Sequence, residues 1–170
     1  NYDMGKISFA EYVSPGHPDK VADIISQYIL DRYLERDPDV RYAIEVLIKG
    51  NVIHLAGEVT STVSFTTKEY ANYVREALES IGYTHDYALK WNGVAKGTVI
   101  DPWDIYVDGS IDGQSPDIAK GVDKEGWGDQ GIFYGYADWD GDMYLMPKAH
   151  AYAKSLCCEL YTDAKEHGVG

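Results

Sequence analysis

Three side chains that can contact a polyphosphate lie within four residues of one another, in the run Gly16-His17-Pro18-Asp19-Lys20. Apolar residues at helical spacing follow this run, so we expect it to begin a helix, and Pro18 suits a first turn. The free amide groups of a helix N-terminus attract phosphate. His17 and Lys20 can add charge-assisted hydrogen bonds, and Asp19 can hold the Mg²⁺ that accompanies polyphosphates. A capped helix with ordinary surface charges in its first turn explains the same residues equally well.

The composition is that of an ordinary globular chain without the charge expected of a nucleic-acid-binding protein. Its 170 residues, 45% hydrophobic and 25% charged, suffice for one domain or two small ones. The formal net charge is −13, so a polyanionic ligand requires a local positive site or bridging metal ions. No apolar run approaches the roughly 18 residues of a membrane span, and no basic-then-apolar signal opens the chain. We therefore expect a cytoplasmic protein without nucleic-acid or membrane partners, in which the adjacent Cys157 and Cys158 are reduced and packed.

The spacing of the apolar residues predicts an alternation of strands and helices. The predicted helices cover residues 18–35, 66–81 and 147–166, and the predicted strands cover residues 6–9, 41–49, 52–60, 104–111 and 132–137. Up to residue 111 the order is β-α-β-β-α-β, with a tight hairpin at Gly50-Asn51. This order predicts an α+β fold in which the helices pack on one face of a mixed sheet.

Two glutamates stand in the predicted strands. Glu45 lies among apolar residues, where a carboxylate requires a partner or a cation because burial of an unpaired charge is costly. Glu58 follows Gly57 near the end of the next strand. The plainer alternative is that both glutamates face solvent.

A glycine-rich segment over residues 113–131 follows the strand predicted at 104–111. It carries several carboxylates and two side-chain amides, and its glycines permit close approach of the backbone to a ligand and hinge motion. It is not a Walker A loop, because no Gly-Lys-Ser/Thr follows. By itself such a segment is only a weak indication of a ligand site.

Taken together, these motifs resemble the methionine adenosyltransferase family, whose members are also called S-adenosylmethionine synthetases. The family's Glu-x-Val-Ser-x-Gly-His-Pro-Asp-Lys is matched by residues 11–20, its Ala-Gly-Glu strand by residues 56–61, and its Ile-Gly-Tyr by residues 81–83. Its Gln-Ser-Pro-Asp-Ile, Gly-Val-Asp and Gly-Asp-Gln-Gly blocks are matched within residues 114–131, and Gly-Tyr-Ala and Leu-Met-Pro within residues 135–147. The blocks occur in the family's order over nearly the whole chain.

The resemblance implies an enzyme that synthesises S-adenosylmethionine from ATP and L-methionine. In that reaction the methionine sulfur attacks C5′ of ATP, and the triphosphate that leaves is hydrolysed to phosphate and diphosphate. The resemblance further implies Mg²⁺ and K⁺ as cofactors. It also implies a homodimer or a dimer of dimers with active sites at the subunit interface.

The matched positions imply a role for individual residues. His17 becomes the catalytic residue that contacts the triphosphate of ATP, Asp19 a Mg²⁺ ligand, and Glu11 a further residue of the same ATP and Mg²⁺ site. Glu45 matches the potassium site, and Lys20 is left with a supporting role. The methionine pocket comprises Glu58, Gln114 and Asp129. The gating loop, residues 113–131, includes Gln114, Ser115, Pro116, Asp117, Asp123 and Trp127.

The chain departs from the family pattern in four respects. Pro15 replaces a common glutamate, the gating loop is short, and an excursion is inserted over residues 92–103. The fourth departure is length: the resemblance implies a first repeat over 10–112, the gating loop over 113–131, and an incomplete second repeat over 132–170. We therefore expect the amino-terminal portion of a synthetase. The alternative is a short, non-catalytic homologue that binds methionine or pairs with a full-length synthetase.

Overall fold

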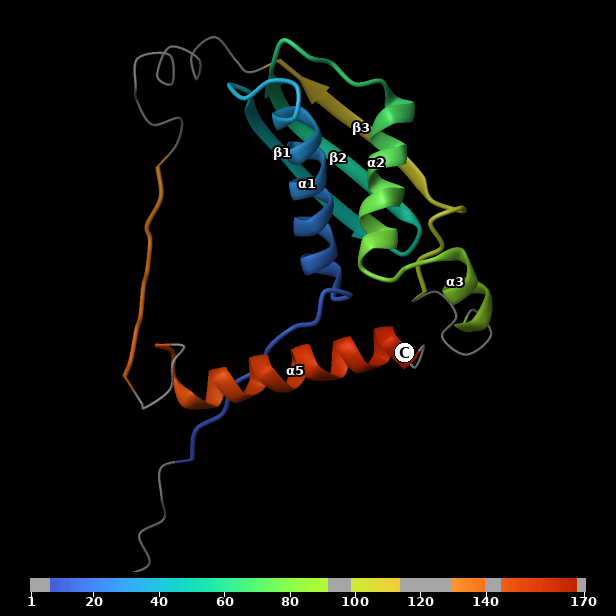
Figure 1. Ribbon diagram of the computed structural model, residues 1–170. Helices are drawn as coiled ribbons and strands as arrows, with labels where there is room; N and C mark the ends of the chain where they lie inside the picture. The colour runs from blue at the N-terminus through green and yellow to red at the C-terminus, as the bar shows by residue number, and fades with distance from the viewer. Residues whose placement is uncertain (1–6, 92–98, 114–129, 140–144, 168–170) are drawn as a thin grey trace, which may run out of the picture. The chain divides into compact units, whose positions relative to one another are not determined.

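The computed structural model describes residues 7–91, 99–113, 130–139 and 145–167, and it divides the chain into two compact units. The first, which we call the α+β unit, is Gly16–Gln130; the second unit combines Asn1–Pro15 with Gly131–Gly170. In chain order the elements are α1 (Pro18–Leu34), β1 (Arg41–Lys49), β2 (Val52–Thr60), α2 (Thr67–Ser80), α3 (His85–Trp91), β3 (Tyr106–Asp112) and α5 (Lys148–His167) (Figure 1). All of these except α5 belong to the α+β unit.

Helices α1 and α2 begin where the sequence provides capping groups. His17 is the N-cap of α1, and its side chain accepts a hydrogen bond from the Asp19 amide. At α2, Thr66 and Glu69 form a capping box, in which each side chain accepts a hydrogen bond from the other residue's amide. The predicted bounds of both helices are confirmed to within one residue.

The three strands form a mixed sheet in the order β1-β2-β3. β1 and β2 are antiparallel and have the predicted bounds, whereas β3 runs parallel to β2. Gly57, opposite Ile44 in this register, is required by its backbone: φ is +147°, and a Cβ at this position would lie 1.9 Å from the Ala43 carbonyl oxygen. The predicted mixed sheet is therefore confirmed, and it requires a glycine at position 57.

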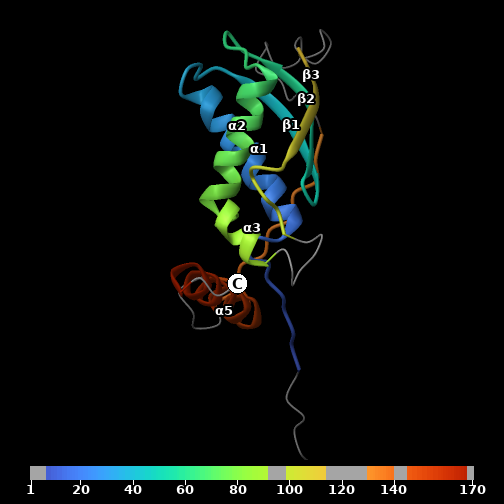
Figure 2. The same ribbon diagram turned by 90° about the vertical axis from the view of Figure 1, so that its right-hand side faces the viewer.

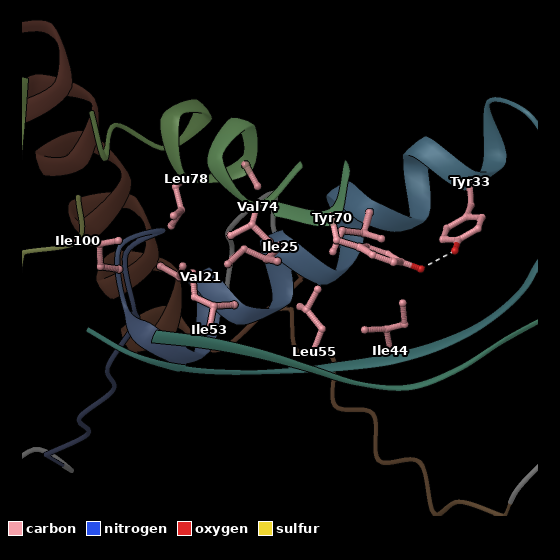
Figure 3. Packing of buried hydrophobic residues seen from close by; sticks show 12 residues of the cluster. Val21, Ile25, Tyr33, Ile44, Ile53, Leu55, Tyr70, Val74, Leu78 and Ile100 are labelled. Atoms are coloured by element: carbon pink, nitrogen blue, oxygen red, sulfur yellow. Dashed lines mark hydrogen bonds between the residues drawn. The ribbon is translucent and has the colours of Figure 1, made fainter. Parts of the chain in front are cut away.

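Helices α1 and α2 cover the same face of this sheet (Figure 2). The buried cluster between them and the sheet comprises Val21, Ile25, Ile29, Tyr33, Ile44, Ile53, Leu55, Tyr70, Val74, Ala77, Leu78 and Ile100 (Figure 3). Most side chains on the opposite face are exposed, among them Leu47 at 67% and Tyr106 at 61%. The predicted arrangement, with helices on one face, is confirmed.

A buried carboxylate fixes the connection between α1 and β1. Asp37 accepts hydrogen bonds from Ser61 Oγ at 2.6 Å, from the Thr62 amide at 2.7 Å and from the Asp39 amide at 3.1 Å. The bond from Ser61, and then that from Thr62, holds the pKa of the Asp37 carboxyl below its ordinary value. The carboxylate thereby joins the start of β1 to the segment that follows β2.

Two of the predicted strands are wrong. Residues 7–9 and 132–137 are described without strand structure, and Ile7, Phe9 and Phe133 are 87%, 95% and 91% exposed. A strand requires a neighbour that pairs with its backbone, and no described residue provides one for either segment. Apolar composition alone therefore predicted strands that these residues do not form.

Helix α3 was not predicted from the sequence. Thr84 caps it, since its Oγ1 accepts a hydrogen bond from the Tyr87 amide at 3.1 Å. A threonine followed by an acidic residue two positions later is a recognisable helix start, but the helix has only seven residues and too little periodicity to stand out. The predicted excursion over 92–103 follows directly, and residues 92–98 lie outside the described part of the chain.

The second unit contains α5, which confirms the helix predicted over 147–166. Its apolar residues are largely exposed: Ala151 is buried, but Leu156 and Leu160 are each 62% exposed. Cys157 and Cys158 are free thiols as predicted, although Cys158 is exposed rather than packed. Across the residues that the structure describes, no helix is both long enough and apolar enough to cross a membrane.

Candidate functional site

His17 is held at the start of α1 by its own backbone and by the helix. Its backbone is extended (φ −64°, ψ 136°), and its carbonyl accepts the first helical hydrogen bond from the Val21 amide at 2.8 Å. Its Nδ1 lies 3.3 Å from the amide nitrogen of Asp19. Because Nδ1 accepts this hydrogen, we assign the proton of the neutral imidazole to Nε2. The ring is exposed, so this Nε2–H group faces solvent.

The charged residues beside His17 are accessible as well. Asp19 is exposed in the first turn, where a carboxylate suits the positive end of the helix dipole. Lys20 Nζ lies 3.4 Å from the Asp23 carboxylate, and the two side chains are 44% and 73% exposed. An exposed ion pair of this kind contributes at most about 1 kcal/mol. Lys20 can therefore leave Asp23 for an anionic ligand at little cost.

Tyr83 contacts Gly16, the residue before His17, and this contact was not predicted. Its hydroxyl donates a hydrogen bond to the Gly16 carbonyl at 3.0 Å, across 67 positions of sequence. Its ring meets the Tyr87 ring edge-on, with centroids 6.0 Å apart. Burial, and then the neighbouring Tyr87, raises the pKa of the Tyr83 hydroxyl, which keeps it protonated as a donor. Neither its residue type nor its spacing predicts this contact.

Glu45 and Glu58 lie together on the face of the sheet that the helices leave open. Glu45 is opposite Ala56, and Glu58 is opposite Ala43, so the two glutamates are diagonal neighbours on adjacent strands. Glu45 is exposed and Glu58 is half-buried. Glu45 has Ala43, Leu47 and Ala56 as neighbours on this face, but it is exposed, so the solvent-facing alternative holds for it in this structure.

The α+β unit does not bring these glutamates to His17. The start of α1 lies at the end of the sheet that carries the turn between β1 and β2 (Figure 1). Glu58 lies near the other end of β2, where it pairs with the third residue of β1. Within one copy of this unit, the predicted triphosphate contact and the predicted methionine contact are therefore separated along the sheet.

The described residues fit the two implied metal ions unequally. Mg²⁺ is often held by one or two carboxylates together with substrate phosphates and water, and the exposed Asp19 suits that mode. A hard cation enclosed by protein needs several oxygen ligands. Glu45 offers a single exposed carboxylate, and the part of the chain described contains no group of three His, Cys, Asp or Glu side chains arranged for a metal ion. Glu45 is therefore not part of such a group among the described residues.

The structure does not test the remaining predicted site residues. Glu11 is exposed and belongs to the second unit. Gln114, Ser115, Pro116, Asp117, Asp123, Trp127 and Asp129 lie outside the described residues. Their assigned roles stay predictions.

Comparison with known proteins gives one consistent family. A family profile described as "S-adenosylmethionine synthetase, N-terminal domain" matches residues 6–102. The curated S-adenosylmethionine synthase of Desulfosudis oleivorans is 38% identical over 168 residues, covering 94% of this chain and 39% of the relative. That of Granulibacter bethesdensis is 42% identical over 172 residues, covering 98% of this chain and 40% of the relative. The chain thus spans about two fifths of the length of these relatives.

A solved structure shows the same fold. It is described as an unusual S-adenosylmethionine synthetase from Campylobacter jejuni, and it matches with a TM-score of 0.74 at 36% sequence identity. The match covers 92% of this chain and 37% of that one. The similarity therefore extends through most of the chain rather than being confined to one motif.

Proposed function

This chain belongs to the S-adenosylmethionine synthetase family, and from that premise we propose that it provides part of the active site of a methionine adenosyltransferase. The proposed reaction joins ATP and L-methionine into S-adenosylmethionine and releases phosphate and diphosphate. The methionine sulfur attacks C5′ of ATP, and negative charge grows on the departing triphosphate. Preorganised donors at that position stabilise the transition state.

The observation that carries this proposal is the capped start of α1. The Asp19 amide engages Nδ1 of His17, so the exposed Nε2–H group is a donor for an oxygen of the triphosphate. Asp19 would hold Mg²⁺, which when bound neutralises phosphate charge and orients the leaving group. Lys20 can release Asp23 and add a cation to the same site. We assign Glu11 to this ATP and Mg²⁺ site on the family motif.

The separation of His17 from Glu58 supports an active site shared between two copies. The attacking sulfur and C5′ must come within about 3–3.5 Å. Glu58, with Gln114 and Asp129, is proposed to bind methionine, yet Glu58 lies toward the opposite end of the sheet from the start of α1. One copy's methionine residues would then meet the other copy's triphosphate residues, in a homodimer or a dimer of dimers. Such an assembly would also have to supply the potassium ligands that Glu45 lacks here.

We further propose that residues 10–112 form the first repeat, that residues 113–131 form the gating loop, and that residues 132–170 begin the second repeat. On this proposal the loop excludes water from the site during the reaction. The enzyme would act in the cytoplasm, without nucleic-acid or membrane partners. The net charge of −13 agrees with the absence of nucleic acid.

The second candidate function is non-catalytic: the chain would be a short homologue that binds methionine or pairs with a full-length synthetase. The chain has 15 Lys and Arg residues against 28 Asp and Glu, which leaves few cations to neutralise a triphosphate. The intact Glu11, His17 and Asp19 favour the catalytic function, because a methionine-binding module has no need of a phosphate donor beside a metal ligand.

The test compares wild type with His17→Ala, and uses His54→Ala as a matched control on an exposed histidine of β2. Binding of Mg²⁺ and inorganic tripolyphosphate is measured by titration calorimetry. S-adenosylmethionine is then sought by mass spectrometry after incubation with ATP, L-methionine, Mg²⁺ and K⁺, with this chain alone and with a full-length synthetase as partner. Loss of a charge-assisted hydrogen bond should weaken tripolyphosphate binding at least about tenfold in His17→Ala and leave His54→Ala unchanged. Equal binding by all three proteins would remove His17 from the site, and methionine binding without tripolyphosphate binding would favour the second function.

A further inference from the structure

Gly16, the residue before the N-cap of α1, accepts a hydrogen bond from Tyr83, which lies three residues after the C-terminal end of α2. The Tyr83 hydroxyl donates to the Gly16 carbonyl at 3.0 Å, and the contact is partly buried. The Gly16 carbonyl belongs to the same rigid peptide plane as the His17 amide. A hydrogen bond on that carbonyl therefore restricts the backbone from which the imidazole projects. Gly16 has no side chain to restrict it, so an external contact matters more here than elsewhere.

The position of Tyr83 is itself determined by how α2 ends. The Gly82 amide donates to the Glu79 carbonyl, and the Tyr83 amide donates to the Leu78 carbonyl, both at 3.1 Å. With Gly82 in the left-handed region (φ +103°), these two bonds are the Schellman arrangement of a helix C-terminus. The arrangement fixes the backbone of Tyr83 one residue beyond the glycine. It thus holds the hydroxyl at a set place relative to the start of α1.

We propose that Tyr83 is a positioning residue for His17. Its hydroxyl holds the Gly16 carbonyl, which keeps His17 at the N-cap with Nδ1 on the Asp19 amide and Nε2–H facing the triphosphate site. The inference rests on the proposed function and deepens it, since it adds a residue from the segment that follows α2 to the support of the phosphate contact. Tyr83 does not touch the substrate in this proposal.

The test uses the whole chain labelled with ¹⁵N at histidine, and it follows the two imidazole nitrogens of His17 by NMR. Tyr83→Phe removes the hydroxyl and retains the ring that packs on Tyr87. Tyr87→Phe removes the hydroxyl of the other ring of this pair and is the matched control. The His17 signals are identified by their loss in His17→Ala. Binding of Mg²⁺ and inorganic tripolyphosphate and the thermal midpoint are measured for each protein.

We expect the His17 signals of wild type to show Nδ1 unprotonated and Nε2 protonated. In Tyr83→Phe they should move toward the average of the two neutral tautomers, and tripolyphosphate should bind about two- to tenfold more weakly, the equivalent of one hydrogen bond. Tyr87→Phe should resemble wild type in both measurements. These results together support the inference.

A merely structural role has a different signature. If Tyr83→Phe lowers the thermal midpoint but its His17 signals match wild type while the chain is folded, the inference is overturned. If the His17 signals change only in Tyr83→Phe and even wild type does not bind tripolyphosphate, Tyr83 does position the ring and the proposed function fails instead. The two failures are therefore distinguishable.

Discussion

His17 shows how one side chain can change what a helix N-terminus offers to a ligand. Pro18 has no amide hydrogen, and the Asp19 amide is already bonded to His17 Nδ1. Fewer backbone donors are therefore free than the sequence alone suggests. A phosphate at this helix would depend more on the Nε2–H group of His17 and on Lys20 than on bare amides. The sequence predicted these residues as a phosphate site, but which of their groups donate and which accept follows only from the cap geometry.

Gly57 is the residue whose replacement should be least tolerated. In Gly57→Ala the new methyl would overlap the Ala43 carbonyl oxygen, and φ of +147° is unfavourable for any side chain. We expect a loss of about 3 kcal/mol or more in the free energy of unfolding, measured by urea denaturation. Gly113→Ala is the control, because a Cβ there meets no atom within 4 Å, and it should stay within about 0.5 kcal/mol of wild type. If Gly57→Ala loses no more stability than Gly113→Ala, the backbone around Gly57 can move aside for a methyl group, and the expected clash with Ala43 does not limit stability.

At the scale of elements, the sequence predicted the helices more accurately than the pairing of strands. The spacing of the apolar residues, with Pro18 in the first turn of α1, predicted nearly the true bounds of α1 and α2, because a helix satisfies its own backbone. The segments 7–9 and 132–137 are as apolar as strands, yet a strand is stabilised by a neighbour that the same residues do not specify. For the same reason the contact between Tyr83 and Gly16 was not predictable.

Asp37 should make the junction of α1 with β1 sensitive to acid. Its pKa in the folded chain is below the ordinary value of 3.8, so its stabilising contribution is complete above that pH and is lost as pH falls through the lower folded value. In Asp37→Asn we expect a lower thermal midpoint at pH 7 and a smaller further loss below pH 3.8 than in wild type.

The control is Asp39→Asn, which removes the same charge two residues away. It retains the bonds from Ser61 and Thr62 to Asp37. The thermal midpoints of wild type and both variants are measured by circular dichroism from neutral to acid pH and compared. Parallel curves for wild type and Asp37→Asn would show that this carboxylate is not what makes the junction acid-sensitive.

At the scale of the whole molecule, stability is concentrated in the α+β unit. Every residue of the buried cluster belongs to Gly16–Gln130, whereas Ala151 is the buried apolar residue of the second unit among those described. The family likeness explains why the motif order alone indicated a synthetase over the chain's length. The grouping of Asn1–Pro15 with Gly131–Gly170 was not predicted, because it depends on contacts rather than on local sequence.

Hydrogen exchange should separate the two units. We expect the buried strands and helix α1 to be strongly protected, and α5 to exchange within about tenfold of an unfolded chain, because an exposed helix of 20 residues is only marginally stable alone. Exchange followed by mass spectrometry on the whole chain provides both values in one experiment, with α1 as the internal reference. Equal protection of α5 and α1 would show that α5 is covered in solution, for example by a second copy.

The parallel pairing of β3 with β2 also implies an order in which the strands pair during folding. β1 and β2 are joined by a tight turn, so they can pair as soon as both have left the ribosome. β3 must find a strand 54 positions earlier in the chain, and closing so long a loop costs more entropy. During refolding, we expect pulse-labelling exchange to protect the amides that join β1 and β2 before the Tyr106 amide, which donates to the Asn51 carbonyl when β3 pairs with β2. The strand that leads into the proposed gating loop is then expected to be the last to join the sheet.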